Sequence, residues 1–191
     1  MAWIEIVTPE RAEGPLAELY RAISGARGGV AEVHQVQSLN PKAMAAHLEL
    51  YKAVVFQRSS LSRRQRERIG VVVSATNACP YCVAHHGQAL RALGEDPAVA
   101  DALERGDVDA APLEAADRAL LAYAARVTAR AASANEDDLH ALRGLGFDDR
   151  ALLDAALTIG YFCFVNRLVL TLGVRLEDGF EQTCAPDMRE A

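Results

Sequence analysis

The sequence has few cysteines, no excess of positive charge and no uninterrupted apolar run long enough to cross a membrane. Its 191 residues include four cysteines, too few for the disulfide framework of a secreted domain. The net charge of −6 argues against non-specific binding to nucleic acid, which requires clustered lysine and arginine. The most apolar stretch, residues 155–172, is interrupted by Asn166 and Arg167 and falls short of the ~20 apolar residues of a membrane span.

The first residues also lack the features of a secretory signal peptide, because Met1-Ala2-Trp3-Ile4-Glu5 has no basic segment followed by an apolar run. We therefore expect a soluble, cytoplasmic protein that binds neither membranes nor nucleic acid. In a reducing compartment, a close pair of cysteines is more often catalytic or metal-binding than structural.

A local cluster of basic residues is the exception to the acidic balance. Its members are Arg63, Arg64, Arg66 and Arg68, with Glu67 among them. Such a cluster could bind phosphate or form a solvated helix face, and the acidic residue within it favours the solvated face.

The fold class follows from another absence, since no segment alternates apolar and polar residues with a period of two and no tight-hairpin dipeptide occurs. Much of the apolar 51% is alanine and leucine, which favour helices. The sequence predicts an all-α bundle of about seven to nine helices. It forms one domain, residues 1–191, in which residues 1–60 are an N-terminal helical extension packed on the core that carries the cysteine pair.

Capping signals set the expected helix boundaries. Thr8-Pro9 and Asn40-Pro41 each place an N-cap before a proline at the first helical position, and Ser62 with Gln65 forms a capping box. Asn135 and Asp148 are further N-caps, and Gly144 and Gly173 are helix ends. These signals predict helices over about residues 8–24, 40–56, 62–76, 79–93, 96–105, 114–131, 136–144 and 149–172.

The most informative segment has the form E-x11-C-x2-C-x3-H, from Glu67 to His86. If a helix begins at Cys79, Cys82 lies about 60° and His86 about 20° from Cys79 around its axis. The two thiols and the imidazole then share one face. On the same projection, Tyr81 points away from that face and His85 lies to its flank.

This arrangement suits proton transfer at a thiol. Cysteines in the first turn lie near unpaired backbone N–H groups and the positive end of the helix dipole, which lower a thiol pKa. His86 follows Cys82 by one turn and is within reach as a general base. Glu67 lies on the preceding helix, which the short connection over residues 77–78 folds back alongside, where an acid can orient the histidine or exchange protons with it.

Three interpretations of the segment are open: a redox pair, a metal site and an inert structural pair. Cys79, Cys82 and His86 with the Glu67 carboxylate could form a zinc shell. Most structural zinc sites draw on two ligand pairs, however, and the chain has no second CxxC and no HxxxH. A CxxC that contains proline at a helix start is also similar to the layout of disulfide oxidoreductases, which favours the redox interpretation.

The run ERIGVVVSATNACPYCVAHH, residues 67–86, resembles the active-site segment of the alkylhydroperoxidase D and carboxymuconolactone decarboxylase superfamily, more narrowly its peroxidase-related branch. The segments at residues 38–41, 166–167 and 172–174 also resemble that branch. The resemblance implies an all-helical fold, assembly into homo-oligomeric trimers or hexamers, and thiol-dependent reduction of hydroperoxides with no bound cofactor or metal.

The same resemblance implies roles for four residues. Cys82 would attack the peroxide and become a sulfenic acid, Cys79 would resolve it as a disulfide, and His86 and Glu67 would belong to the proton relay. An external dithiol, lipoyl-linked in the alkylhydroperoxidase D group, would reduce the disulfide, whether carried by a protein or a small molecule. Tyr81 stands where alkylhydroperoxidase D has a histidine, so the role of that histidine is not carried over.

Other polar residues outside the segment are interpreted from their neighbours. Cys163 is expected in the core, and Cys184 in an exposed or partner-facing tail. Asn166 and Arg167 interrupt an apolar helix, either as a face at a subunit interface or as the polar wall of the active-site cavity. The scattered His34, His47 and His140 are expected to be structural.

Overall fold

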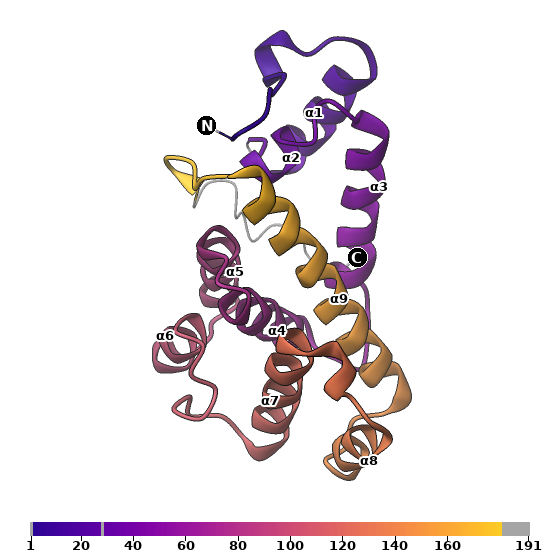
Figure 1. Cartoon of the computed structure of the whole chain (residues 1–191), viewed down its shortest axis with the longest axis vertical. Coiled ribbons are helices and arrows are strands. Elements are labelled where there is room, and N and C mark those ends of the chain that lie inside the picture. Colours follow the sequence, from indigo (N-terminus) through magenta and orange to yellow (C-terminus); the bar gives the residue numbers. More distant parts are fainter. Residues whose placement is uncertain (1, 28, 181–191) are drawn as a thin grey trace.

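The computed structural model describes residues 2–27 and 29–180, and within these ranges every regular element is helical (Figure 1). The all-α prediction is therefore confirmed. The α-helices are α1 (Gly14–Arg27), α2 (Glu32–Gln35), α3 (Pro41–Tyr51), α4 (Arg63–Thr76), α5 (Pro80–Ala92), α6 (Pro97–Glu104), α7 (Ala115–Ala129), α8 (Glu136–Gly144) and α9 (Asp149–Leu172). Short turns of other helix types are η1 (Pro9–Arg11), η2 (Lys52–Phe56) and η3 (Ala131–Ser133).

Capping residues begin the helices where the sequence predicts them. The Asn40 side chain accepts a hydrogen bond from the Ala43 N–H, and Ser62 with Gln65 forms the expected capping box. Asn135 and Asp148 cap α8 and α9 in the same way. Each satisfies a backbone N–H that has no partner within the helix.

The prediction for the N-terminal segment is wrong in two respects. Instead of one helix from Thr8 to Ser24, the chain forms the short η1, leaves helical geometry, and starts again at Gly14. The cause is Pro15, because the residue before a proline is disfavoured in the α region, and Gly14 adopts a φ of +54°. The helix then continues through Gly25, where the sequence predicted a break.

Helix α4 lies at the centre of the fold and packs against α5, α6, α7 and α9 (Figure 1). Its predicted apolar segment is buried. At Gly70 the approach of α9 is so close that an added Cβ would lie 2.5 Å from Cζ of Phe162. The segment that precedes the cysteine pair is thus fixed from several sides.

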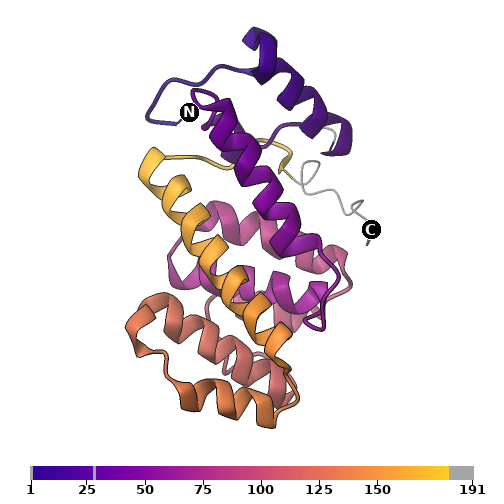
Figure 2. The same cartoon turned by 90° about the vertical axis from the view of Figure 1, so that its right-hand side faces the viewer.

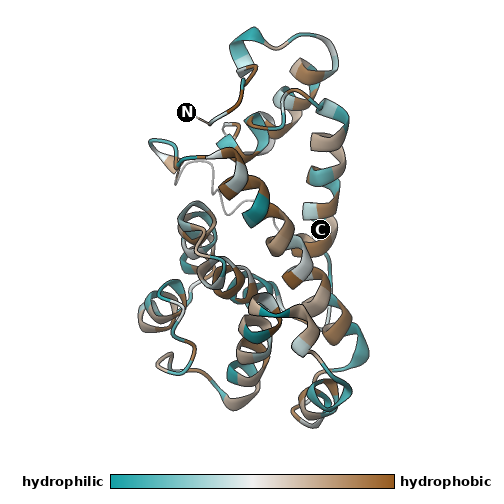
Figure 3. Ribbon diagram, in the orientation of Figure 1, coloured by the Kyte–Doolittle hydropathy of each residue, from teal (hydrophilic) through white to brown (hydrophobic). Residues whose placement is uncertain are grey.

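Helix α9 is long and apolar enough to span a membrane by length and composition, which the interrupted run 155–172 did not lead us to expect. Of its most apolar window, 44% is buried inside the protein, and the core helix of a soluble protein meets the same criterion. Its buried Asp154 accepts hydrogen bonds from Arg150 and Gln57. Both brown and teal residues occur along α9 in Figure 3.

The N-terminal helices lie at one end of the molecule, and α3 runs beside α9 (Figure 2). A hydrogen bond of 2.9 Å between Nε2 of His47 and the hydroxyl of Tyr161 joins the two helices. The segment after α9 returns towards α5, where Glu177 lies 3.3 Å from Nε2 of His85. The division into an extension over residues 1–60 and a cysteine-bearing core stays a prediction.

Candidate active site

The two predicted cysteines lie where α4 turns back into α5. Ala78 adopts a φ of +53°, a left-handed conformation that is costly for a residue with a side chain, and the Cys79 N–H then bonds to the Ser74 carbonyl at 2.9 Å. Cys79 becomes the N-cap of α5 and Pro80 its first residue. The tight turn therefore places both thiols, which are free and buried, at the start of α5 as the sequence predicts.

A partly open cavity of about 70 Å³ lies against Cys82, between α3, α5, α9 and the segment around α2. Its wall includes Cys82, His86, Arg63, His47 and Tyr161. Cys79 is fully buried and lies behind this wall. A small molecule in the cavity would thus meet the sulfur of Cys82 rather than that of Cys79.

Glu67 is held between two basic side chains. It is fully buried, and its Oε2 lies 2.7 Å from Nδ1 of His86, while its Oε1 accepts a hydrogen bond of 2.9 Å from Nε of Arg63. Burial alone would raise the pKa of Glu67, but His86 and Arg63 together hold it at about 2. Because Nδ1 of His86 donates to this carboxylate, Nε2 is the ring nitrogen that can exchange a proton in the cavity.

Arg63 is a site residue that the sequence analysis assigned to a solvated helix face, and that assignment is wrong. Its side chain is 17% exposed, pairs with Glu67 one turn later, and lies over the ring of Phe56 at 3.7 Å. The available signal was the spacing of four residues between Arg63 and Glu67, which places opposite charges together on a helix.

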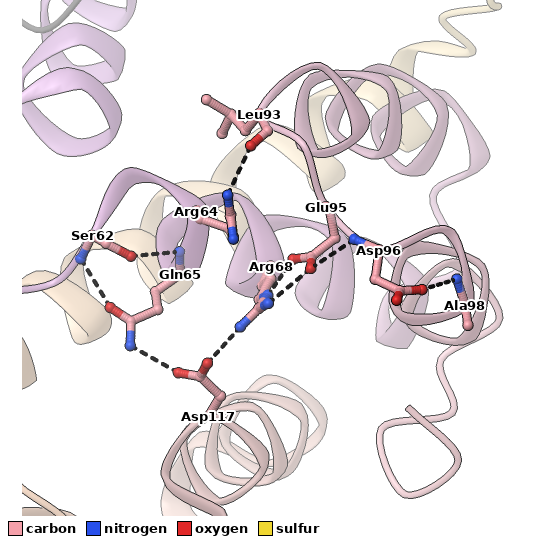
Figure 4. Close-up of polar contacts among 9 residues, drawn as sticks. All are labelled: Ser62, Arg64, Gln65, Arg68, Leu93, Glu95, Asp96, Ala98 and Asp117. Atoms are coloured by element: carbon pink, nitrogen blue, oxygen red, sulfur yellow. Dashed lines mark hydrogen bonds and ion pairs between the residues drawn. The ribbon is translucent and has the colours of Figure 1, made fainter. Parts of the chain in front are cut away.

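Two other arginines of the same cluster are also buried. Arg68 donates to Oε1 of Glu95 at 2.8 Å and pairs with Asp117, to which Gln65 donates as well (Figure 4). The charge of Arg68, which the sequence analysis assigned to a solvated face, instead connects α4 to α7 and to the segment before α6. Its role is to fix the position of α4.

The two thiols differ in acidity because they are hydrogen-bonded to each other. The bond from Cys82 lowers the pKa of Cys79, whereas donation to Cys79, together with burial, raises the pKa of Cys82 well above its usual value. The hydrogen bonds with Cys82 thus favour a thiolate at Cys79, whereas Cys82 lacks the lowered pKa that the dipole argument predicted for both thiols. To act as a nucleophile, Cys82 needs a base such as His86.

Asn166 lies behind the cysteines and fits neither of the interpretations offered for it. It is fully buried, donates to Oγ of Ser74 at 3.1 Å and accepts from Nδ2 of Asn77 at 2.9 Å. Its amide also lowers the pKa of both thiols. Asn166 therefore supports the α4–α5 turn from α9. Cys163 is half-buried against the core, and Cys184 lies outside the described residues.

Four side chains that the sequence analysis placed away from the site line the cavity instead. His34 and His47 were expected to be structural, Tyr81 to point away, and His85 to lie to the flank. The helical projection in the sequence analysis considered α5 alone, whereas residues near α2 and on α3 complete the cavity wall. The rings of Tyr81 and His85 also contact each other there, with centroids 4.4 Å apart. Burial lowers the pKa of His47 to about 4, so its ring is neutral at physiological pH.

The arrangement gives no support to a metal site. Within residues 2–27 and 29–180, no group of three or more His, Cys, Asp or Glu side chains is arranged to hold a metal ion. The oxygens of Glu67, the carboxylate expected in such a shell, are directed to Arg63 and His86. A cation at that point would face the positive charge of Arg63.

Comparison with known proteins identifies relatives of both the sequence and the fold. The profile of the Carboxymuconolactone decarboxylase family matches residues 41–125, which contain both cysteines, Glu67 and His86. A peroxidase-related protein from Ralstonia eutropha JMP134 has 28% identity and a TM-score of 0.86, with 96% of each chain covered. No curated protein gives a significant match.

Two further solved structures are similar to the chain. A peroxidase-related protein from Silicibacter sp. TM1040 has 29% identity and a TM-score of 0.81, covering 96% of this chain and 93% of the other. A debrominase in complex with 2,3,4-tribromopyrrole has 17% identity and a TM-score of 0.74, covering 96% and 97%. An identity of 17% shows that the debrominase shares the fold, but it says nothing about the substrate of this chain.

Proposed function

We propose that the chain belongs to the alkylhydroperoxidase D and carboxymuconolactone decarboxylase superfamily and that it reduces hydroperoxides through Cys82 and Cys79. The superfamily consists of enzymes, which supports a catalytic role. The observation that carries the proposal is the position of Cys82 on the wall of a cavity, beside a histidine oriented by a buried carboxylate.

The proposed reaction begins with proton transfer from the Cys82 thiol to Nε2 of His86, directly or through a water in the cavity. Glu67 stays ionised because of its depressed pKa and so stabilises the imidazolium that forms. The Cys82 sulfur attacks the terminal peroxide oxygen. An S–O bond forms, the O–O bond breaks, and the leaving alkoxide takes up the proton held by His86.

Cys79 completes the cycle. Its thiolate attacks the sulfur of the Cys82 sulfenic acid, a disulfide forms, and hydroxide leaves and is protonated to water. The interaction between the two thiols supports this step, because it brings their sulfur atoms near each other before oxidation. An external dithiol then reduces the disulfide, and we propose a lipoyl-linked dithiol for this role.

We also propose that the protein works in the cytoplasm as a homo-oligomer, a trimer or hexamer. In support, large apolar side chains lie exposed on neighbouring faces of α3 and α9 and line a shallow groove: Leu50, Leu153, Leu157 and Phe164. A second copy covering this groove would remove that apolar surface from water.

The test is consumption of an organic hydroperoxide by metal-free protein supplied with dihydrolipoamide. We expect turnover by the wild type and none by Cys82→Ser, because serine cannot form the sulfenic acid. Cys163→Ser, a half-buried cysteine outside the cavity lining, is the matched control and should keep wild-type turnover.

The remaining outcomes separate the alternatives. A wild-type disulfide that forms under peroxide without turnover would favour a redox sensor. Bound zinc lost in Cys79→Ser would favour a metal site. If peroxide produces no disulfide at all, the redox proposal is wrong.

A further inference from the structure

A chain of hydrogen bonds on the cavity wall opposite α5 fixes the direction of one proton. Nε2 of Gln37 lies 2.7 Å from the backbone oxygen of Val33, which can only accept, so this atom of the amide is the NH₂ group. The same nitrogen lies 2.8 Å from Nδ1 of His47, and Oε1 of the amide lies farther from Nδ1, at 3.1 Å. A proton on Nδ1 would face the NH₂ group at the shorter of these two contacts, so we assign Nδ1 as the acceptor from the NH₂ group.

The tautomer of His47 follows from this contact. With Nδ1 as the acceptor, the ring proton is on Nε2, in accord with the neutral state that burial imposes on His47. Nε2 lies 2.9 Å from the hydroxyl oxygen of Tyr161 and therefore donates to it. The hydroxyl hydrogen of Tyr161 must then point away from His47, since two hydrogens cannot occupy one hydrogen bond.

The position of the Tyr161 ring is fixed by its aromatic neighbours. It stacks on Tyr51 with a centroid distance of 5.6 Å and an interplanar angle of 26°, and it also contacts the ring of Phe162, with a centroid distance of 5.3 Å. Tyr161 lines the same cavity as Cys82 and His86, but it comes from α9, whereas they come from α5. The cavity thus has a thiol and its base on one wall and an oriented phenol on another.

We propose that Tyr161 is a catalytic residue that donates a hydrogen bond to the leaving oxygen of the hydroperoxide as the O–O bond breaks, and that His47 and Gln37 are its positioning residues. This role depends on the proposed peroxide reduction. The proton that neutralises the alkoxide is the one that Cys82 gave to His86. Tyr161 keeps its own proton and stabilises the negative charge that develops before that transfer.

The energetic reason is that a preorganised donor in a site without bulk water stabilises developing charge at little cost of reorganisation. Nε2–H of His47 strengthens the effect, because donation to the phenol oxygen makes its O–H a better donor. The rate enhancement from the Tyr161 hydrogen bond must grow with the basicity of the leaving group. An alkoxide needs such a donor, while a carboxylate leaving group hardly does.

This dependence supplies the experiment, which compares two oxidants on reduced protein in single-turnover oxidation of Cys82. With tert-butyl hydroperoxide we expect Tyr161→Phe to react about 10²-fold more slowly than the wild type. With peracetic acid, whose leaving group is acetate, we expect a loss of about tenfold or less, since less charge has to be stabilised.

Two further variants keep the result interpretable. His47→Phe removes the Nε2–H donor and should show the same selective loss in weaker form, because Tyr161 loses the group that orients it. Tyr123→Phe, on α7 and outside the cavity lining, is the matched control and should react like the wild type with both oxidants.

The contradicting outcomes differ for the two proposals. If neither oxidant reacts with Cys82 in the wild type, the proposed function fails and the role of Tyr161 with it. If the wild type reacts but Tyr161→Phe loses the same factor with both oxidants, or loses nothing, Tyr161 has no such role and the proposed function stands.

Discussion

The charge on Glu67 offers the most direct test of the site's electrostatics. The carboxyl has a pKa of about 2 in the folded protein, against 4.5 for an unperturbed glutamate. That difference corresponds to about 3 kcal/mol of stability at neutral pH. Because the folded-state pKa is the lower one, this contribution is present above pH 4.5 and is lost as the pH falls towards 2.

Glu67→Gln removes the titrating group and keeps the side-chain shape. We expect the difference in free energy of unfolding between wild type and Glu67→Gln to shrink by about 2 kcal/mol between pH 5 and pH 3, measured by urea denaturation. The absolute destabilisation at pH 5 should be larger, about 3–5 kcal/mol, since Arg63 and the His86 ring lose their buried partner.

Glu49→Gln is the matched control, because Glu49 forms an exposed ion pair with Lys52 on the surface. Such pairs contribute about 0–1 kcal/mol, so its difference from the wild type should change little over the same pH range. Parallel curves for wild type and Glu67→Gln from pH 5 to pH 3 would refute the reasoning, because they would mean that Glu67 is not held as a carboxylate.

Two further predictions concern the packing around α4. Gly70→Ala should destabilise the protein by about 1–3 kcal/mol in thermal denaturation, because the new methyl group would overlap the ring of Phe162. Gly25→Ala, whose Cβ meets nothing within 4 Å on α1, should instead stabilise by up to about 1 kcal/mol, and equal effects would contradict the close approach. Arg68→Ala should cost about 3–5 kcal/mol by urea denaturation, since it leaves Glu95 buried without its cation, and a loss below about 1 kcal/mol would mean that this pair adds little.

Much of the fold could be predicted from local signals. The capping side chains of Asn40, Ser62, Asn135 and Asp148 act within a few residues of their own position, so the sequence contains the whole interaction. The error near Thr8 was also local, since Pro15 was present in the sequence and explains the break.

The candidate site divides in a similar way. Cys82 and His86 are separated by a single turn of α5, and the cavity brings them together as the spacing predicts. His47 and Tyr161 are separated by 114 residues and meet because α3 runs beside α9. No pattern within either helix specifies that contact, so a histidine and a tyrosine that look ordinary in sequence could not be assigned to the site.

The near-complete burial of Cys82, which is 2% exposed, also constrains its reductant. Under the proposed function, the Cys79–Cys82 disulfide would have to be reached past the elements that line the cavity, α2, α3 and α9. The broad surface of a folded protein could not contact so buried a sulfur, so we expect the reductant to carry its dithiol at the end of a long, thin, flexible arm.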